Sequence, residues 1–241
     1  MTILVTSGCS CSVVMENWKF KTWPWHLEKN LATLENYHVG RLAQGNGLIS
    51  RQLIYTLDRL LKTHSSQELL VGIMWSGTDR FDFYSEDPAD DVLAQPPLLK
   101  PFRFVDKGYG QWVLVNSHWQ NPTSKNYFAN FHDDAGAMIT TYEHILRTQW
   151  FLKLHNIRYF MSTISGVVLN HTRWQDHPDI SYLRNQVDFE NFLPVDGIWD
   201  WAQNHSGLEF DRNDLAHPTT EQNQKFVQEI VQPFLKQKNL I

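Results

Sequence analysis

The feature that most constrains the fold is an uninterrupted apolar segment at residues 69–75, which reads LLVGIMW. A strand with one solvated face alternates apolar and polar residues, whereas a parallel strand covered by helices on both faces is apolar throughout. Residues 3–6 form a shorter β-branched run that stops before Gly8, and residues 158–164 form another candidate core strand. These segments predict the inner strands of a parallel sheet.

Amphipathic helices are predicted between these strands. Residues 49–60 show helical periodicity, with Ile49, Leu53, Leu57 and Leu60 on one side. Residues 138–155 and 220–236 continue the pattern, and Thr219 with Gln222 forms a capping-box sequence at the start of the last helix. A helix at 25–34 and a strand at 37–42 complete the expected order. Strands alternating with helices predict an α/β protein, with a central, mostly parallel sheet in a three-layer α/β/α fold.

The chain has 241 residues, of which 42% are hydrophobic, enough for a sizeable core in one domain. We therefore expect a single domain over residues 1–241, with irregular insertions at about 84–135 and 165–208. The first insertion is rich in aromatic residues. These rings are expected to pack the insertion onto the core, with the alternative that a few line a substrate cleft.

Charge and cysteine usage restrict the partners. The net charge is −5 and the basic residues are scattered, so the sequence predicts no nucleic-acid partner and a neutral or weakly charged ligand. Cys9 and Cys11 lie two positions apart, where strand side chains point to opposite faces, which disfavours a mutual disulfide and suits a reducing compartment. No signal-peptide core or membrane-spanning stretch is present, so we expect a cytoplasmic location without a membrane partner.

Two distant segments together carry a catalytic pattern. Ser10 follows Gly8 and Cys9 just after the first strand, and Asp214 lies three residues before His217, just before the last helix. A serine hydroxyl is a weak nucleophile at neutral pH, and it needs a base within hydrogen-bond reach and a carboxylate that orients the base. Because Asp-x-x-His places both partners on one turn, the sequence predicts a Ser10–His217–Asp214 triad.

These two segments resemble the first and last conserved blocks of the SGNH (GDSL-like) hydrolases, with Cys9 in place of the acidic residue of the first block. The segments at 42–49 and 23–27 resemble the second block and the entry to the first helix. The resemblance implies the flavodoxin-like fold of that family and an oxyanion hole formed by the N–H groups of Ser10 and Gly45, with the Asn46 amide as a further donor. The alternative for Asn46 is a structural one, as a turn or helix-start residue. The third block usually contains an asparagine, and Thr78 follows Ser76 and Gly77 at the corresponding place, so Thr78 or Ser76 is an alternative donor.

The resemblance implies an esterase that hydrolyses small acyl esters, such as O-acetyl groups on a carbohydrate, through an acyl-Ser10 intermediate and without a cofactor. Two alternatives stay open. The same triad would serve an acyltransferase with an acceptor other than water, and a weakly active or inactive chain would serve as a binding or structural module. The sequence does not predict the oligomeric state.

Other chemistry-bearing residues have simpler interpretations. Ser12 is a competing nucleophile in the first segment, but the family register favours Ser10. Cys9 and Cys11 lack a second cysteine cluster, so metal binding is not expected. Loosely spaced His and Asp residues also resemble metal ligands, but such clusters in loops are usually solvated turns, and no metal is predicted; these residues are His132, Asp133, Asp134, His171, Asp176 and His177.

Overall fold

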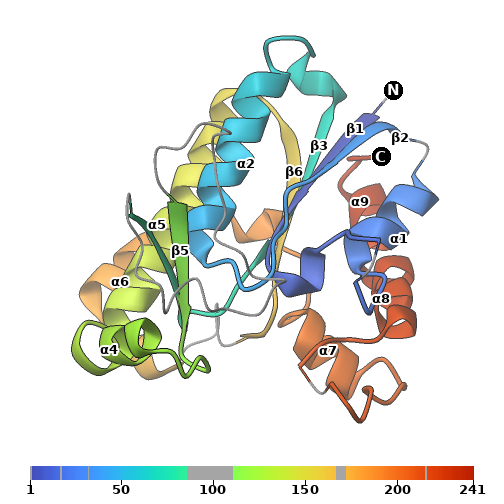
Figure 1. The fold of residues 1–241 in the computed structure, drawn as a ribbon. Coiled ribbons are helices and arrows are strands. Elements are labelled where there is room, and N and C mark those ends of the chain that lie inside the picture. Colours follow the sequence, from blue (N-terminus) through green and yellow to red (C-terminus); the bar gives the residue numbers. More distant parts are fainter. Residues whose placement is uncertain (1, 17, 32, 86–110, 167–171, 215) are drawn as a thin grey trace.

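A computed structural model describes residues 2–16, 18–31, 33–85, 111–166, 172–214 and 216–241. Its central sheet has four parallel strands in the order β2-β1-β3-β6 (Figure 1). The strands are β1 (Thr2–Ser7), β2 (Thr33–His38), β3 (Leu69–Trp75) and β6 (Arg158–Thr163). All residues of β3 are buried, which confirms that its apolar run is covered on both faces.

Helices cover both faces of this sheet, so the fold is a three-layer α/β/α arrangement (Figure 1). On one face lie α2 (Asn46–Leu60) and α5 (Asp134–Leu154), which share a core with β1, β3 and β6. The other face carries α1 (Trp23–Asn30), α8 (Thr220–Phe226) and α9 (Gln232–Gln237). Leu53 and Leu57 of α2 are fully buried, as the amphipathic pattern predicts.

The predicted last helix is continuous but not uniform. The predicted capping box is confirmed, because Thr219 Oγ1 accepts from the Gln222 N–H and the Gln222 side chain accepts from the Thr219 N–H. A π-helical segment, Val227–Val231, then joins α8 to α9. Pro233 lies in the first turn of α9 and has no N–H to donate to the preceding turn. A wider turn before a proline relieves the clash between its ring and the preceding carbonyl.

Two expected boundaries near the N-terminus are wrong. The helix predicted at 25–34 is α1, which begins at Trp23 with Pro24 in its first turn, where proline is favoured, and ends at Asn30. The strand predicted at 37–42 is β2, which begins at Thr33. β2 is an edge strand of the sheet, where polar residues such as Glu35 and Asn36 are tolerated. These residues interrupt the apolar pattern from which a strand is predicted.

The two expected insertions contain regular elements that the sequence did not predict. Overlapping the first are the antiparallel strands β4 (Arg80–Ser85) and β5 (Gln111–Asn116), followed by α4 (Pro122–Asn130), while 86–110 lie outside the described residues. The second holds α6 (Pro178–Arg184) and α7 (Ile198–Asn204). Short 3₁₀ turns occur at Ser10–Ser12, Ser66–Glu68, Thr172–Trp174 and Phe189–Asn191.

The strand order locates the edge at which a site is expected. From β1 the chain passes through α1 to β2 on one side, and it returns through α2 to β3 on the other side. In open α/β sheets, ligands bind outside the carboxyl ends of the strands at such a reversal. Ser10 follows β1 and Ser76 follows β3 at this edge. In the described part of the chain, no helix has the length and apolar character needed to cross a bilayer.

Candidate active site

The structure brings the three predicted triad residues into one hydrogen-bonded chain. Ser10 Oγ lies 2.9 Å from His217 Nε2, although the two residues are 207 positions apart. On the other side of the ring, His217 Nδ1 lies 2.9 Å from Asp214 Oδ1 and 3.1 Å from Oδ2. These distances are those required of a nucleophile, its base and the carboxylate that orients the base.

The triad lies at the surface but is sheltered. Ser10 is 7% exposed, whereas the side chains of His217 and Asp214 are each 22% exposed. Trp18 meets the His217 ring edge-on with 5.6 Å between ring centroids, and Phe20 packs beside the ring at 6.4 Å. These aromatic contacts restrict rotation of the imidazole, which keeps Nε2 directed at Ser10.

The turn that presents Ser10 is fixed by its neighbours on three sides. A Cβ atom at Gly8 would lie 2.8 Å from Ser12 Cβ and 2.9 Å from the Met74 carbonyl oxygen, so only glycine fits this close approach. The Gly8 carbonyl accepts a hydrogen bond from Gln44 Nε2 at 3.0 Å. Ser12 Oγ accepts one from Trp23 Nε1 at 2.9 Å. Ser12 is fully buried and occupied by this contact, so Ser10 alone of the two serines faces the histidine.

Asn223 in α8 ties the two halves of the triad together. Its Oδ1 accepts from the Trp23 N–H at 2.9 Å, and its Nδ2 donates to the Pro218 carbonyl at 2.9 Å. Trp23 also holds the turn after Ser10, and Pro218 directly follows His217. Asn223 is 1% exposed, and its amide therefore helps to set the spacing between Ser10 and His217.

Both cysteines are free and buried, which agrees with the expectation of no mutual disulfide. A hydrogen bond from Cys11 holds the pKa of the Cys9 thiol well below its usual range, against the effect of burial, and the Arg80 guanidinium lowers it further. The hydrogen bond to Cys9 and desolvation raise the pKa of Cys11. Cys9 thus gives Arg80 a negatively polarised neighbour.

The predicted oxyanion donors differ in their availability. Asn46 Nδ2 donates to the Ser76 carbonyl and to Thr141 Oγ1, both at 3.1 Å, and its Oδ1 accepts from the Ser76 N–H at 2.8 Å. The Asn46 amide thus links α2 to the end of β3 and to α5, and both of its hydrogens are used. In this arrangement Asn46 is a structural clip and has no amide hydrogen left for an oxyanion.

Gly45 contacts a buried carboxylate that the sequence did not single out. Desolvation raises the pKa of Asp82 to about 6, and the nearby Arg51 guanidinium and the N–H groups of Gly45 and Leu48 oppose this rise. A Cβ atom at Gly45 would meet Asp82 Oδ1, which shows how closely the two pack. An ionised Asp82 therefore competes with an oxyanion for the Gly45 N–H. The Ser10 N–H begins a 3₁₀ turn, where N–H groups lack a partner within the turn.

The residues weighed as metal ligands do not form a metal-binding cluster in the described part of the chain, where no group of three or more His, Cys, Asp or Glu side chains converges. His132 Nε2 lies 3.2 Å from Asp134 Oδ1, and Asp133 caps the start of α5 by accepting from the Gly136 N–H at 2.8 Å. His171 lies outside the described residues.

Neither a scan against protein-family models nor a search of curated proteins found a match for this chain. The site is therefore interpreted from its own geometry. Sequence reasoning gave no role to Asn223, Gln44 or Asp82. Gln44 lies within the segment that resembles the second block, but its own contact was not foreseen, and Asp82 lies in a strand that the sequence did not predict. Asn223 is a polar residue inside the predicted last helix, and a buried polar side chain there needs a partner, which is the one signal that pointed to it.

Proposed function

We propose that the protein is a serine ester hydrolase of the SGNH (GDSL-like) type. The observation that carries this proposal is the hydrogen-bonded chain from Ser10 Oγ through His217 to Asp214, located at the carboxyl end of β1. A structural serine beside a surface histidine would not need a carboxylate on the far ring nitrogen. The combination is the one that lowers the barrier for acyl transfer to a hydroxyl.

In this proposal the proton path follows the hydrogen-bonded chain. With its hydrogen on Nδ1 donated to Asp214, His217 accepts the Ser10 proton at Nε2. Ser10 Oγ bonds to the acyl carbon of the ester, His217 passes the proton to the leaving alcohol oxygen, and the carbon–oxygen bond to that alcohol breaks. Water then attacks the acyl-Ser10 carbonyl carbon as His217 removes its proton. The bond between that carbon and Ser10 Oγ breaks, His217 returns the proton to Oγ, and the acid is released.

The oxyanion hole in this proposal uses backbone donors. The Ser10 N–H is one donor, and the Gly45 N–H is a second whenever Asp82 is protonated or withdraws. Thr78, which stands where the SGNH third block carries asparagine, is the candidate side-chain donor. Because loss of one such donor typically costs about 10²–10³ in rate, we expect slower turnover than in an SGNH enzyme with a complete hole.

The test is hydrolysis of 4-nitrophenyl acetate by the full chain. Ser10→Ala, His217→Gln and Asp214→Asn should each reduce kcat by about 10³-fold or more. Ser66→Ala and His205→Gln are matched controls, since Ser66 lies in a 3₁₀ turn that precedes β3 and His205 is exposed after α7. Turnover that survives Ser10→Ala, or that is absent from the folded wild-type protein, would refute the proposal.

A further inference from the structure

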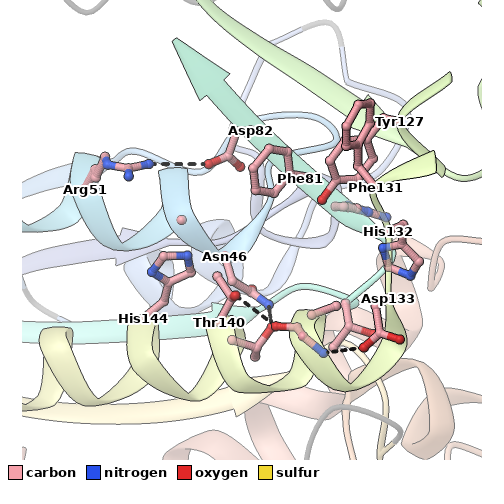
Figure 2. Close-up of a pocket in the computed structure, with 16 residues that line it drawn as sticks. Asn46, Arg51, Phe81, Asp82, Tyr127, Phe131, His132, Asp133, Thr140 and His144 are labelled. Atoms are coloured by element: carbon pink, nitrogen blue, oxygen red, sulfur yellow. Dashed lines mark hydrogen bonds and ion pairs between the residues drawn. The ribbon is translucent and has the colours of Figure 1, made fainter. Parts of the chain in front are cut away.

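A pocket lies between the start of α2, strand β4, and helices α4 and α5 (Figure 2). Its volume of about 360 Å³ is at the lower end of the range of small-molecule sites, roughly 300–1,000 Å³. The triad residues do not line it, but Asn46 and Thr78 do. Arg80 also lines it and contacts Cys9, the residue before Ser10. The pocket therefore adjoins the proposed catalytic serine.

Two arginines line this pocket and present N–H donors to a ligand. Arg51 Nη1 lies 3.7 Å from Asp82 Oδ2, and the guanidinium packs over the Trp112 ring at 4.5 Å, so its position is fixed while its side chain stays 40% exposed (Figure 2). Arg80 Nε and Nη1 are buried without a hydrogen-bond partner among the described residues. A guanidinium that is held in place with free N–H groups is suited to bind a carboxylate with two parallel hydrogen bonds.

The ionisable groups around these arginines include carboxylates as well as a neutral histidine. Desolvation lowers the pKa of His144 to about 3, and the Arg147 and Arg51 charges lower it further, so this imidazole is neutral at physiological pH. Two carboxylates line the pocket together with the two arginines: Asp133, and Asp82, whose pKa of about 6 reflects its burial. Cys9 and Asp79 act on Arg80 and raise its pKa against the effect of desolvation. The unpartnered N–H groups of Arg80 and the exposed guanidinium of Arg51, and not a net positive charge, are therefore what suit the pocket to a carboxylate.

The opposite wall of the pocket is aromatic. Phe81 and Tyr127 stack with 4.7 Å between ring centroids and 10° between ring planes. Phe131 is 71% exposed at the end of α4, and Figure 2 shows the three rings on the side of the pocket away from Arg51. Exposed aromatic rings bind the apolar CH faces of sugar rings, which water solvates poorly.

We propose that this pocket is a substrate subsite for a carboxylated sugar, with the carboxylate on Arg51 and Arg80 and the ring against Phe131. This inference rests on the proposed function for its link to catalysis, because it makes the substrate an acyl ester on an acidic sugar whose ester reaches Ser10. It replaces the neutral or weakly charged ligand that the composition predicts. The overall charge of −5 gave no indication of the two arginines that line this pocket.

The test compares the binding of methyl β-glucuronide and methyl β-glucoside to the full-length protein by calorimetry. Neither compound carries an acyl ester, so binding is measured without turnover. Because a charge-assisted hydrogen bond contributes about 1.5–3 kcal/mol, the glucuronide should bind about 10–100-fold more tightly. Arg51→Gln should reduce this preference to less than about threefold, whereas Arg59→Gln, on the exposed side of the same helix, should leave it unchanged.

Phe131→Ala provides a second variant that does not disturb the interior, since Phe131 is exposed. It should weaken the binding of both glycosides by about tenfold while preserving their ratio, and Leu154→Ala, an equally exposed position on α5, should change neither. Absence of glucuronide binding to the wild-type protein, equal binding of both glycosides, or displacement of glucuronide by acetate at equal concentration would overturn the inference.

The outcome is separable from that of the proposed function. Ser10-dependent hydrolysis of 4-nitrophenyl acetate without glucuronide preference would refute the subsite and keep the esterase. Glucuronide preference that depends on Arg51, without Ser10-dependent hydrolysis, would refute the esterase and keep the pocket.

Discussion

Asp82→Asn should become more stable relative to the wild type as pH rises towards neutral, within a defined window of pH. Burial raises the pKa of Asp82 from its ordinary value of 3.8 to about 6, and its side chain is 2% exposed. Between these values the folded protein holds a proton that the unfolded chain has released. The contribution of Asp82 to the free energy of unfolding is therefore largest below about pH 4, falls as pH rises, and is lost above about pH 6. The difference amounts to about 3 kcal/mol at most.

The assay is urea unfolding of the wild-type and Asp82→Asn proteins at a series of pH values from about 4 to about 7.5. The stability of the variant relative to the wild type should rise by up to about 3 kcal/mol across this range. A difference in stability that is the same at every pH reflects the packing of asparagine and does not affect the test. His144 titrates in both proteins, so its contribution cancels in the comparison. A flat difference, or a variant that becomes relatively less stable as pH rises, would refute the reasoning and indicate that the Arg51 pair stabilises an ionised Asp82.

Three further predictions concern the site and its supports. Gly8→Ala should lower the midpoint of thermal unfolding and reduce ester turnover together, because its methyl group would collide with Ser12 and the Met74 carbonyl; wild-type values for both would contradict the close packing. Asn223→Ala should reduce the free energy of chemical unfolding by about 1–3 kcal/mol, because it leaves the Trp23 N–H without its partner. It should also lower kcat more than it raises KM, and an unchanged kcat would argue against a positioning role for Asn223. His144→Asn should become more stable relative to the wild type as pH falls from about 6.5 towards 4. The reason is that the pKa of His144 is about 3 in the folded protein, so its imidazole stays neutral there while the same histidine in the unfolded chain binds a proton. A difference in unfolding free energy that is the same at every pH would disprove this.

The sequence was informative where one physical demand dominated a segment. Burial on both faces makes β3 apolar throughout, so its boundaries are predicted correctly, and β2 was misplaced because an edge strand meets no such demand. The Asp-x-x-His spacing predicted the contact with Ser10 because the chemistry itself requires those residue types.

Other parts depended on contacts that no local pattern encodes. Asn46 was predicted as an oxyanion donor from its place after Gly45, but its partners come from Ser76 and Thr141, which lie 30 and 95 positions away. Asp82 was overlooked because its burial follows from the packing of β4 against α2, which the sequence did not predict. The arginine-lined pocket was hidden for the same reason, since its walls come from four separate elements.

The central claim is that Ser10 is a nucleophile activated by His217, and covalent labelling with a fluorophosphonate tests it most directly. Mass spectrometry of the intact wild-type protein should show the addition of one phosphonyl group, and fragmentation of its N-terminal peptide should place that group on Ser10 and not on Ser12. Labelling should disappear in Ser10→Ala and slow by about 10³-fold or more in His217→Gln. A folded wild-type protein that resists the reagent, or a Ser10→Ala protein that is labelled at the wild-type rate, would contradict the account.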